Sequence, residues 1–536
     1  MGGPDKDIWL ESMNEEVQSH IRCGTFEPVP KSSATTRPIP LQWIYKVKHE
    51  KSIPVRAKSR LVARGDRCEE GVHYKEVHAP TVHFNTTRTF LSQCCQRGWE
   101  IYQMDVSTAF INADLDRDDV YFNLPPGPSI PEFTSPDGTP MVLHAKRALY
   151  GMPQAPRLWN RRLTDWLNSQ GFVASSKDPC LFTAKYDNGD EIHLICYVDD
   201  IAFAGNNPDA IAKFKAELSA EFKMSDLGSL NWFLGCEVIQ DLVKGTTKLV
   251  QTSYINDVVG RFSDHLTPGV KVSTPCAPDF VYTEDDCPSD PAAADKQYMW
   301  RSLYRSLVGC LLYASVLSRT DITYDVAQLS RFVSNPGPNH WNQAIRVLTY
   351  LRDTADIGIT YTRSADPSIA NKLFLFVDAT WADCPDNRRS TSGIICMLNG
   401  GAVSWSSKKQ EIVAQSSCES ELIAACAGAN DAMFIRYLLE DLGAPQGPTR
   451  VYEDNRATRI IVQNPGILRK RSRHFEVRFY KVQEYETRGL TRMVQVPTLS
   501  QLADLLTKNT TTKIFLRLRN IIMGDVPFHH HLFTDD

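Results

Sequence analysis

The stretch Leu194-Ile195-Cys196-Tyr197-Val198-Asp199-Asp200-Ile201-Ala202-Phe203 places two adjacent aspartates inside an otherwise apolar run. We interpret it as a β-hairpin that presents both carboxylates at its turn. Burying two like charges together is costly unless a cation compensates them, and carboxylate oxygens are ligands that suit Mg²⁺. The alternative is an Asp-Asp turn without a metal, because aspartate is favoured in turns by its own backbone hydrogen bonds.

A second strand-like run, residues 100–110 (EIYQMDVSTAF), favours the metal interpretation. It contains Asp105, followed by small residues and an aromatic. A third carboxylate beside Asp199 and Asp200 would complete a two-metal site for in-line phosphoryl transfer, in which the ions lie about 3.5–4 Å apart.

The motifs QMDVSTAFINADL (103–115), LYGMPQAPRLW (149–159) and YVDD (197–200) resemble the polymerase of copia-type long-terminal-repeat retrotransposons. The blocks KSRLVARG (58–65), DLGSLNWFLGCEV (226–238) and YRSLVGCLLYASVLSRTDI (304–322) occur in the family's order. The resemblance implies a multidomain α+β and α/β fold: a right-hand polymerase of fingers, palm and thumb, followed by a ribonuclease H-like mixed-sheet domain.

The same resemblance implies residues that bind substrate. Lys58 and Arg60, in a basic hairpin, would face the incoming triphosphate, and Gln154 and Arg157 would lie against nucleotide and template. Phe110 occupies the family position whose ring excludes a ribose 2′-hydroxyl. Each has a plainer interpretation: a charged edge hairpin exposed to solvent, a polar residue at a helix start, and a core phenylalanine.

The C-terminal part repeats the pattern of carboxylates beside apolar stretches. Asp378 lies in the strand-like LFLFVDAT, Glu419 and Glu421 in the helical QSSCESELIAACAG, Asp454 after VYE, and Asp504 in QLADLLTKN. These elements match the order of a ribonuclease H site, and the family pattern selects Glu421 over Glu419. A solvent-facing charge is the commoner role for any one of these residues. The basic stretch 468–484 with His474 is either a phosphate-binding surface or a solvated helix face.

Length and composition set further limits. A chain of 536 residues should form several domains. We expect fingers and palm in 1–240, thumb and connection in 241–362, a linker in 363–372, the ribonuclease H-like domain in 373–515 and a tail in 516–536. The stretch LNWFLGCEVIQD reads as one strand. The sequence shows no signal peptide and no apolar run of the ~20 residues that a membrane span needs, and its 14 scattered cysteines indicate neither zinc nor disulfides.

The predicted function is that of an RNA-directed DNA polymerase with ribonuclease H activity. Each site would use two Mg²⁺ ions, with Mn²⁺ as an alternative. The expected partners are an RNA template, a DNA primer, RNA–DNA hybrids and deoxynucleoside triphosphates, with integrase or Gag of the same element as further candidates and no membrane. The expected location is a cytoplasmic virus-like particle, with the nucleus as the alternative. A decayed or host-adopted copy that binds nucleic acid without turnover is the competing hypothesis.

Overall fold

The computed structural model describes residues 6–50, 53–127, 130–277, 280–298, 300–464, 479–526 and 528. The chain divides into two compact units: unit 1 comprises residues 1–82 and 103–228, and unit 2 comprises residues 83–102 and 229–536. Part of unit 1 is thus inserted between two segments of unit 2. His474 with its basic neighbours up to residue 478, and the histidines 529–531, lie outside the described residues.

Unit 1 is built on three sheets and three helices. The helices are α1 (Lys6–Arg22), α3 (Ala155–Ser169) and α4 (Pro208–Glu221). The largest sheet has the order β11 (Met224–Ser229), β4 (Ile101–Val106), β10 (Asp200–Gly205), β9 (Glu191–Tyr197), β8 (Leu181–Lys185) and β7 (Val173–Ala174). A three-stranded sheet follows the order β1 (Phe26–Pro30), β6 (Met141–Ala145) and β5 (Tyr121–Phe122), and β2 (Leu41–Glu50) pairs with β3 (Ile53–Ala63) as a two-stranded hairpin.

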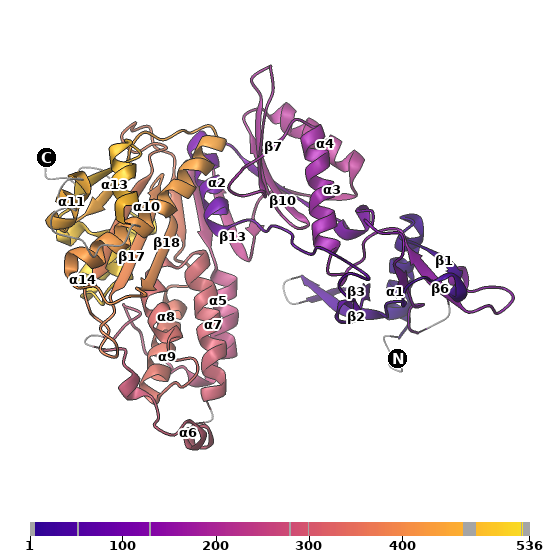
Figure 1. The fold of residues 1–536 in the computed structure, drawn as a ribbon, viewed down its shortest axis with the longest axis horizontal. Coiled ribbons are helices and arrows are strands. Elements are labelled where there is room, and N and C mark those ends of the chain that lie inside the picture. Colours follow the sequence, from indigo (N-terminus) through magenta and orange to yellow (C-terminus); the bar gives the residue numbers. More distant parts are fainter. Residues whose placement is uncertain are drawn as a thin grey trace. The chain divides into compact units, whose positions relative to one another are not determined.

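Helices α3 and α4 lie against the six-stranded sheet and close the core of unit 1 (Figure 1). The apolar stripe of α4 is buried, as its helical spacing predicts. Phe214 of this stripe meets Phe203 of β10 with ring centroids 5.1 Å apart, and Trp166 of α3 lies 5.6 Å from Phe222. This aromatic layer fixes the strands that carry the central aspartates.

Unit 2 contains two sheets and ten described helices. The four-stranded sheet has the order β12 (Trp232–Phe233), β13 (Cys236–Asp241), β14 (Thr246–Val250) and β15 (Ile359–Thr362); the five-stranded sheet has the order β18 (Gly401–Lys409), β17 (Thr391–Leu398), β16 (Phe374–Thr380), β19 (Thr449–Glu453) and β20 (Thr491–Gln495). The helices are α2 (Phe84–Arg97), α5 (Thr252–Arg261), α6 (Pro291–Gln297), α7 (Arg301–Leu317), α8 (Thr323–Ser330), α9 (Pro338–Asp353), α10 (Ser417–Asp441), α11 (Arg456–Gln463), α13 (Phe479–Thr487) and α14 (Thr512–Ile522).

The five-stranded sheet is mixed. β16 pairs antiparallel with β17 and parallel with β19, and β19 pairs parallel with β20. α10 crosses this sheet against β16 and β17 (Figure 1). Among the described helices, α10 alone has the length and hydropathy of a membrane span, but most of its apolar window is buried inside the fold, as in a core helix.

Two expectations about elements differ from the structure. LNWFLGCEVIQD is not one strand: Leu234 and Gly235, both with positive φ, form a tight turn between β12 and β13. Such φ values are those of a two-residue hairpin turn. The tail expected from residue 516 begins inside α14, where Leu518 is fully buried and so belongs to the core.

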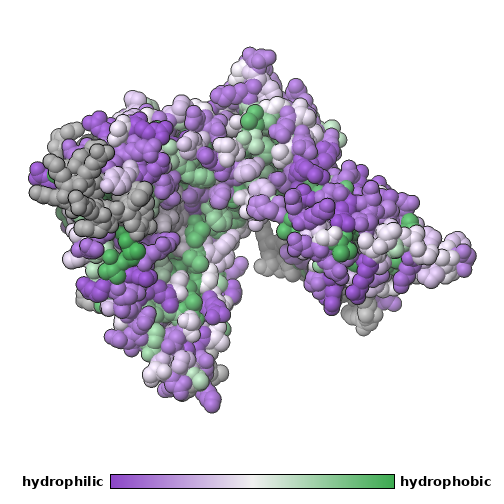
Figure 2. Space-filling view, in the orientation of Figure 1, coloured by the Kyte–Doolittle hydropathy of each residue, from purple (hydrophilic) through white to green (hydrophobic). Residues whose placement is uncertain are grey.

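Figure 2 shows hydrophobic residues gathered over α5 and α7 of unit 2. The exposed members on α7 are Leu303, Leu312, Tyr313 and Val316. Other positions of α7 pack into the unit, where Tyr304, Leu307 and Leu311 are buried. α7 is therefore apolar on its outer side as well as on its core side.

Candidate active sites

The YVDD stretch forms the turn between β9 and β10. Tyr197 pairs with Asp200, which leaves Val198 and Asp199 as a two-residue turn. Val198 has φ of +58°, a left-handed conformation that is rare for a β-branched residue. The Val198 carbonyl accepts a 2.6 Å hydrogen bond from Trp159 Nε1, and this bond anchors the turn to α3. The hairpin predicted from the sequence is present.

Asp105 lies on β4, the neighbour of β10 in the sheet. The Val106 amide donates to the Asp199 carbonyl at 2.9 Å, so the turn is tied to the strand of Asp105. Burial, followed by the charges of Asp199 and Asp105, raises the pKa of Asp200 to about 6. Gln103 Nε2 donates to Asp200 Oδ1 at 3.3 Å. The structure thus brings Asp105 and Asp200 onto adjacent strands of unit 1, with Asp199 in the turn beside them.

Phe110 lies in a short 3-10 helix (Ala109–Asn112) directly after β4. The centroid of the Phe110 ring is 4.6 Å from the centroid of the Tyr150 ring. The Arg60 guanidinium lies over the Tyr150 ring, 4.2 Å from its centroid. Burial, opposed by Arg60, raises the pKa of Tyr150 to about 12. Lys58 is two residues before Arg60 on β3, so strand alternation places both on one face.

Gln154 and Arg157 are engaged within unit 1. Gln154 is buried at the start of α3, where its Nε2 donates to the His73 carbonyl at 3.0 Å. Its Oε1 is buried and, among the described residues, without a hydrogen-bond partner. Arg157 Nε donates to the Glu76 carbonyl at 3.0 Å, and its Nη2 pairs with Asp116. Gln154 therefore keeps an acceptor to offer, whereas Arg157 is held by acidic partners.

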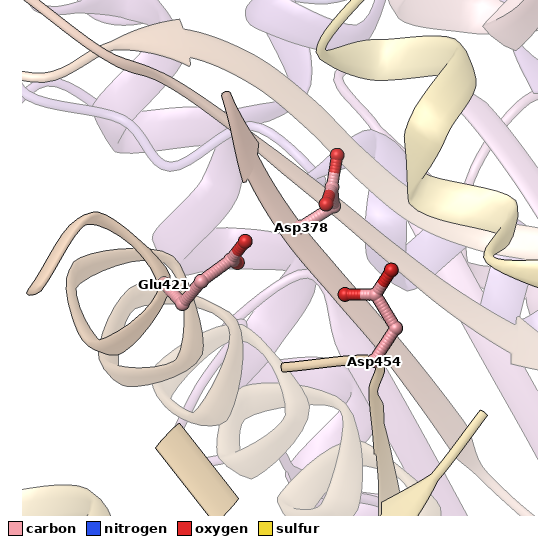
Figure 3. A group of neighbouring side chains, drawn as sticks. All are labelled: Asp378, Glu421 and Asp454. Atoms are coloured by element: carbon pink, nitrogen blue, oxygen red, sulfur yellow. The ribbon is translucent and has the colours of Figure 1, made fainter. Parts of the chain in front are cut away.

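The second cluster lies in unit 2. Asp378 of β16, Glu421 of α10 and Asp454 after β19 point toward a common centre (Figure 3), and each offers an oxygen within 4.8 Å of the others. Among the described residues, no other trio of potential ligands is this tight. Glu419 faces elsewhere: its carboxylate accepts from the Gln415 amide at 2.6 Å, and its own amide donates to the helix cap Ser416.

Asp504 is buried in the 3-10 helix Leu502–Leu506 and belongs to the same cluster. Burial, followed by the charge of Asp378, raises its pKa to about 7. Burial and neighbouring carboxylates also raise the pKa of Glu421 well above its usual value. Glu421 Oε2 is buried and has no hydrogen-bond partner among the described residues. An orphaned oxygen amid buried carboxylates fits a divalent cation with hard oxygen ligands.

Two residues of this cluster were not foreseen from the sequence. Glu453 is fully buried beside Asp454, and its Oε1 accepts from the Asn455 amide at 2.9 Å. Lys508 places Nζ 2.8 Å from Asp504 Oδ1 and 3.8 Å from Asp378 Oδ2. Both carry a sequence signal: Glu453 precedes Asp454 at a strand end, and Lys508 follows Asp504 by four residues, one helical turn.

Comparisons with known proteins place the chain in a family. A family model described as reverse transcriptase (RNA-dependent DNA polymerase) matches residues 25–278. A Pol polyprotein from transposon TNT 1-94 of Nicotiana tabacum is 33% identical over 508 residues, which are 94% of this chain and 37% of the relative. The putative transposon Ty5-1 protein of Saccharomyces cerevisiae is 30% identical, over 60% of this chain and 98% of its own length.

A solved structure of a foamy viral protease–reverse transcriptase in complex with double-stranded DNA covers 91% of this chain and 69% of its own, with a TM-score of 0.51 and 13% identity. This likeness concerns the fold alone and confirms the expected right-hand polymerase followed by a ribonuclease H-like mixed-sheet domain. The chain spans about a third of the length of the plant Pol polyproteins that it matches. It belongs to the Pol proteins of copia-type long-terminal-repeat retrotransposons.

Proposed function

We propose that this chain is a reverse transcriptase that copies RNA into DNA and degrades the RNA of RNA–DNA hybrids. The observation that carries the proposal is the division of seven carboxylates into two clusters, one in each unit. Asp105 and Asp200 lie on adjacent strands of unit 1, and Asp199 lies in the turn that leads into the second of them. The members in unit 2 are Asp378, Glu421, Asp454 and Asp504.

In the polymerase site, Asp105 and Asp199 would hold two Mg²⁺ ions, with Mn²⁺ as the alternative, and Asp200 would assist through the local field. Ions bound at these sites would supply activation of the attacking oxygen, which is the primer 3′-hydroxyl in the first site and a water in the second, and stabilisation of the leaving oxygen. Phe110 would exclude the ribose 2′-hydroxyl. Lys58 and Arg60, on one face of β3, would face the triphosphate. The Oε1 of Gln154, which has no hydrogen-bond partner within the described part of the chain, and the Arg157 side chain would contact nucleotide and template.

In the second site, Asp378, Glu421, Asp454 and Asp504 would hold the ions at the scissile phosphate of the RNA strand. Their mutual repulsion and burial favour a cation at this place. The substrates would be an RNA template, a DNA primer, deoxynucleoside triphosphates and RNA–DNA hybrids. Integrase or Gag from the same element would be partners, in a cytoplasmic virus-like particle or in the nucleus.

The second candidate function is nucleic-acid binding without turnover by a decayed or host-adopted copy. All seven carboxylates are present, which favours the enzyme. The domain scheme of fingers and palm, thumb and connection, linker and nuclease domain is retained as part of the proposal.

The test is extension of a labelled DNA primer on an RNA template with Mg²⁺ and the four deoxynucleotides. Asp199→Asn should abolish extension and keep cleavage of the template, and Asp378→Asn should do the reverse. Asp187→Asn and Asp257→Asn, at exposed aspartates of unit 1 and unit 2, are the matched controls. A folded wild-type chain that binds the hybrid but neither extends nor cleaves would instead establish the binding-only function.

A further inference from the structure

We propose that Lys508 is a tethered cation that competes with a divalent ion for Asp378 and Asp504. The inference rests on the proposed ribonuclease H function and adds the order in which the two ions bind. The Glu421–Asp454 edge of the site would bind its ion first and tightly. The Asp378–Asp504 edge would bind its ion second and weakly, because the lysine ammonium must leave.

The geometry of Lys508 supports this role. Its Nζ lies 2.8 Å from Asp504 Oδ1 and 3.8 Å from Asp378 Oδ2, so one ammonium serves both carboxylates. The Lys508 amide donates to the Asp504 carbonyl at 3.2 Å, which holds both residues on one turn of backbone. The Lys508 side chain is 39% exposed, whereas those of Asp378 and Asp504 are buried. The ammonium therefore has a route to solvent that the carboxylates lack.

The two edges of the site differ in the positive charge that lies beside them. Asp378 receives a hydrogen bond from Thr507 Oγ1 in addition to the nearby ammonium. Glu421 Oε2 and Asp504 Oδ1 are both buried and have no hydrogen-bond partner among the described residues, but the Lys508 ammonium lies 2.8 Å from the Asp504 oxygen. An ion at the Glu421 edge gains Glu421 Oε2 as a ligand without displacing an ammonium from that carboxylate. An ion at the Asp504 edge must first displace the Lys508 ammonium from its ion pairs with Asp504 and Asp378, which weakens its binding on the order of tenfold or more.

The experiment measures Mn²⁺ binding by the full chain with calorimetry and electron paramagnetic resonance. The polymerase site is silenced by Asp105→Asn with Asp199→Asn, so that the remaining ions report on unit 2. Lys508→Met should tighten the weaker Mn²⁺ site by about tenfold or more. Lys508→Arg, which keeps the charge, and Lys513→Met, at an exposed lysine of α14, should leave that affinity as it is in the silenced chain.

Thermal unfolding gives a second readout that does not depend on activity. In EDTA, Lys508→Met should lower Tm, because Asp378 and Asp504 lose their compensating charge, and Mg²⁺ should restore Tm. A lysine that only packs would lower Tm equally with and without Mg²⁺, and that result would overturn the proposal. If Lys508→Met does not fold, Lys508→Gln removes the charge while retaining a polar side chain, and the same outcomes apply.

Different results would refute the competition by Lys508 and the proposed nuclease function. If Asp378→Asn weakens Mn²⁺ binding but Lys508→Met leaves it unchanged, the competition is refuted and the metal site stands. If Asp378→Asn has no effect on Mn²⁺ binding, the cluster holds no ion and the proposed nuclease function is itself refuted.

Discussion

At the scale of single residues, the fully buried carboxyl of Asp325 makes the stability of unit 2 depend on pH. Tyr282 Oη donates to Asp325 Oδ1 at 2.6 Å, and Cys276 and Arg346 also face it. Burial outweighs these contacts and raises its pKa to about 6. Because the folded chain then binds a proton that the unfolded chain releases near pH 4, the free energy of unfolding should fall as pH rises from about 4 to 6 and stay lower above it.

Asp325→Asn should remove the loss of stability that ionisation of the buried Asp325 carboxyl causes above about pH 6. We expect the free energy of unfolding to rise by up to about 3 kcal/mol at pH 7.5, which corresponds to about two pKa units, and to change little at pH 4.5. Chemical denaturation of both chains at the two pH values measures this. An equal gain at both pH values would show that the amide improves packing, and that ionisation of Asp325 is not the cause.

The ring of Phe110 is held by Tyr150, and this contact predicts how nucleotide selection responds to substitution. Phe110→Ala should increase ribonucleotide incorporation relative to deoxynucleotides on the order of tenfold or more, as expected when a steric contact is removed. Tyr150→Ala should act in the same direction, because Phe110 loses its neighbour at 4.6 Å. Tyr150→Phe keeps the ring and is the control. Single-nucleotide extension measures the ratio, and an unchanged ratio in Phe110→Ala would exclude the gate.

The carboxylates of the second cluster were easier to predict from the sequence than the residues that contact them. Asp378, Glu421 and Asp454 each stand beside an apolar run, and the structure brings them within 4.8 Å. The pair of Lys508 and Asp504 follows a spacing of four residues, but the pairs Lys508–Asp378 and Tyr150–Phe110 join residues far apart in the chain. Spacing in the sequence does not reveal such pairs, because they are made by the tertiary fold.

At the scale of elements, α10 lies so close to the sheet that one position must be glycine. A Cβ on Gly428 would come within 2.6 Å of Val377 Cγ1, next to Asp378 on β16. Overpacking of this kind costs about 1–3 kcal/mol, which exceeds the helix propensity of about 1 kcal/mol gained from alanine. Gly428→Ala should therefore lower the free energy of unfolding and slow RNA cleavage.

Gly309 of α7 is the matched control for Gly428, because a Cβ there would have no neighbour within 4 Å. Gly309→Ala should raise the free energy of unfolding by up to about 1 kcal/mol. Denaturant unfolding and template cleavage of both variants check the pair. If Gly428→Ala is as stable as Gly309→Ala, an alanine fits between α10 and β16, and the predicted clash with Val377 is wrong.

Elements with strong periodicity were predictable, and those defined by backbone conformation were not. The stripe of α4 and the hairpin around Asp199 follow directly from apolar spacing. The turn at Leu234 and Gly235 was missed because a leucine with positive φ has no sequence signal. α14 was missed because its helix pattern is short and is stabilised mainly by burial of Phe515 and Leu518.

At the scale of the whole molecule, unit 2 is assembled from distant segments. Arg88 of α2 is buried, and its guanidinium donates to the Val403 carbonyl at 2.9 Å and to the Leu317 carbonyl at 3.0 Å while lying over the Trp405 ring. α2 comes from the middle of the predicted fingers and palm, 1–240, yet the compact unit that contains it is unit 2. Composition along the chain does not reveal such an exchange, because α2 carries polar residues such as Thr86, Arg88 and Gln93 that are nevertheless buried in unit 2.

This assembly predicts which fragments fold. The hydrophobic core of unit 2 is continuous from α5 through α9 to β16 and α14. Tyr350 of α9 connects these parts: its Oη donates to Asp321 at 2.6 Å and accepts from Arg519 of α14 at 3.2 Å. A fragment of residues 373–536 would expose this core and leave buried polar groups without partners. It should therefore unfold at a much lower temperature than unit 2 does in the full chain, or aggregate.

Residues 83–102 joined to residues 229–536 by a short Gly/Ser linker should instead melt cooperatively. The linker is feasible because the Leu230 amide donates to the Ile101 carbonyl at 2.7 Å, so the two segments already meet at the cut. Near-ultraviolet circular dichroism with heating compares this fragment with 373–536 and with 229–536 lacking α2. Equal, cooperative melting of all three would mean that the strands and helices after residue 373 fold without the help of Arg88 and α9.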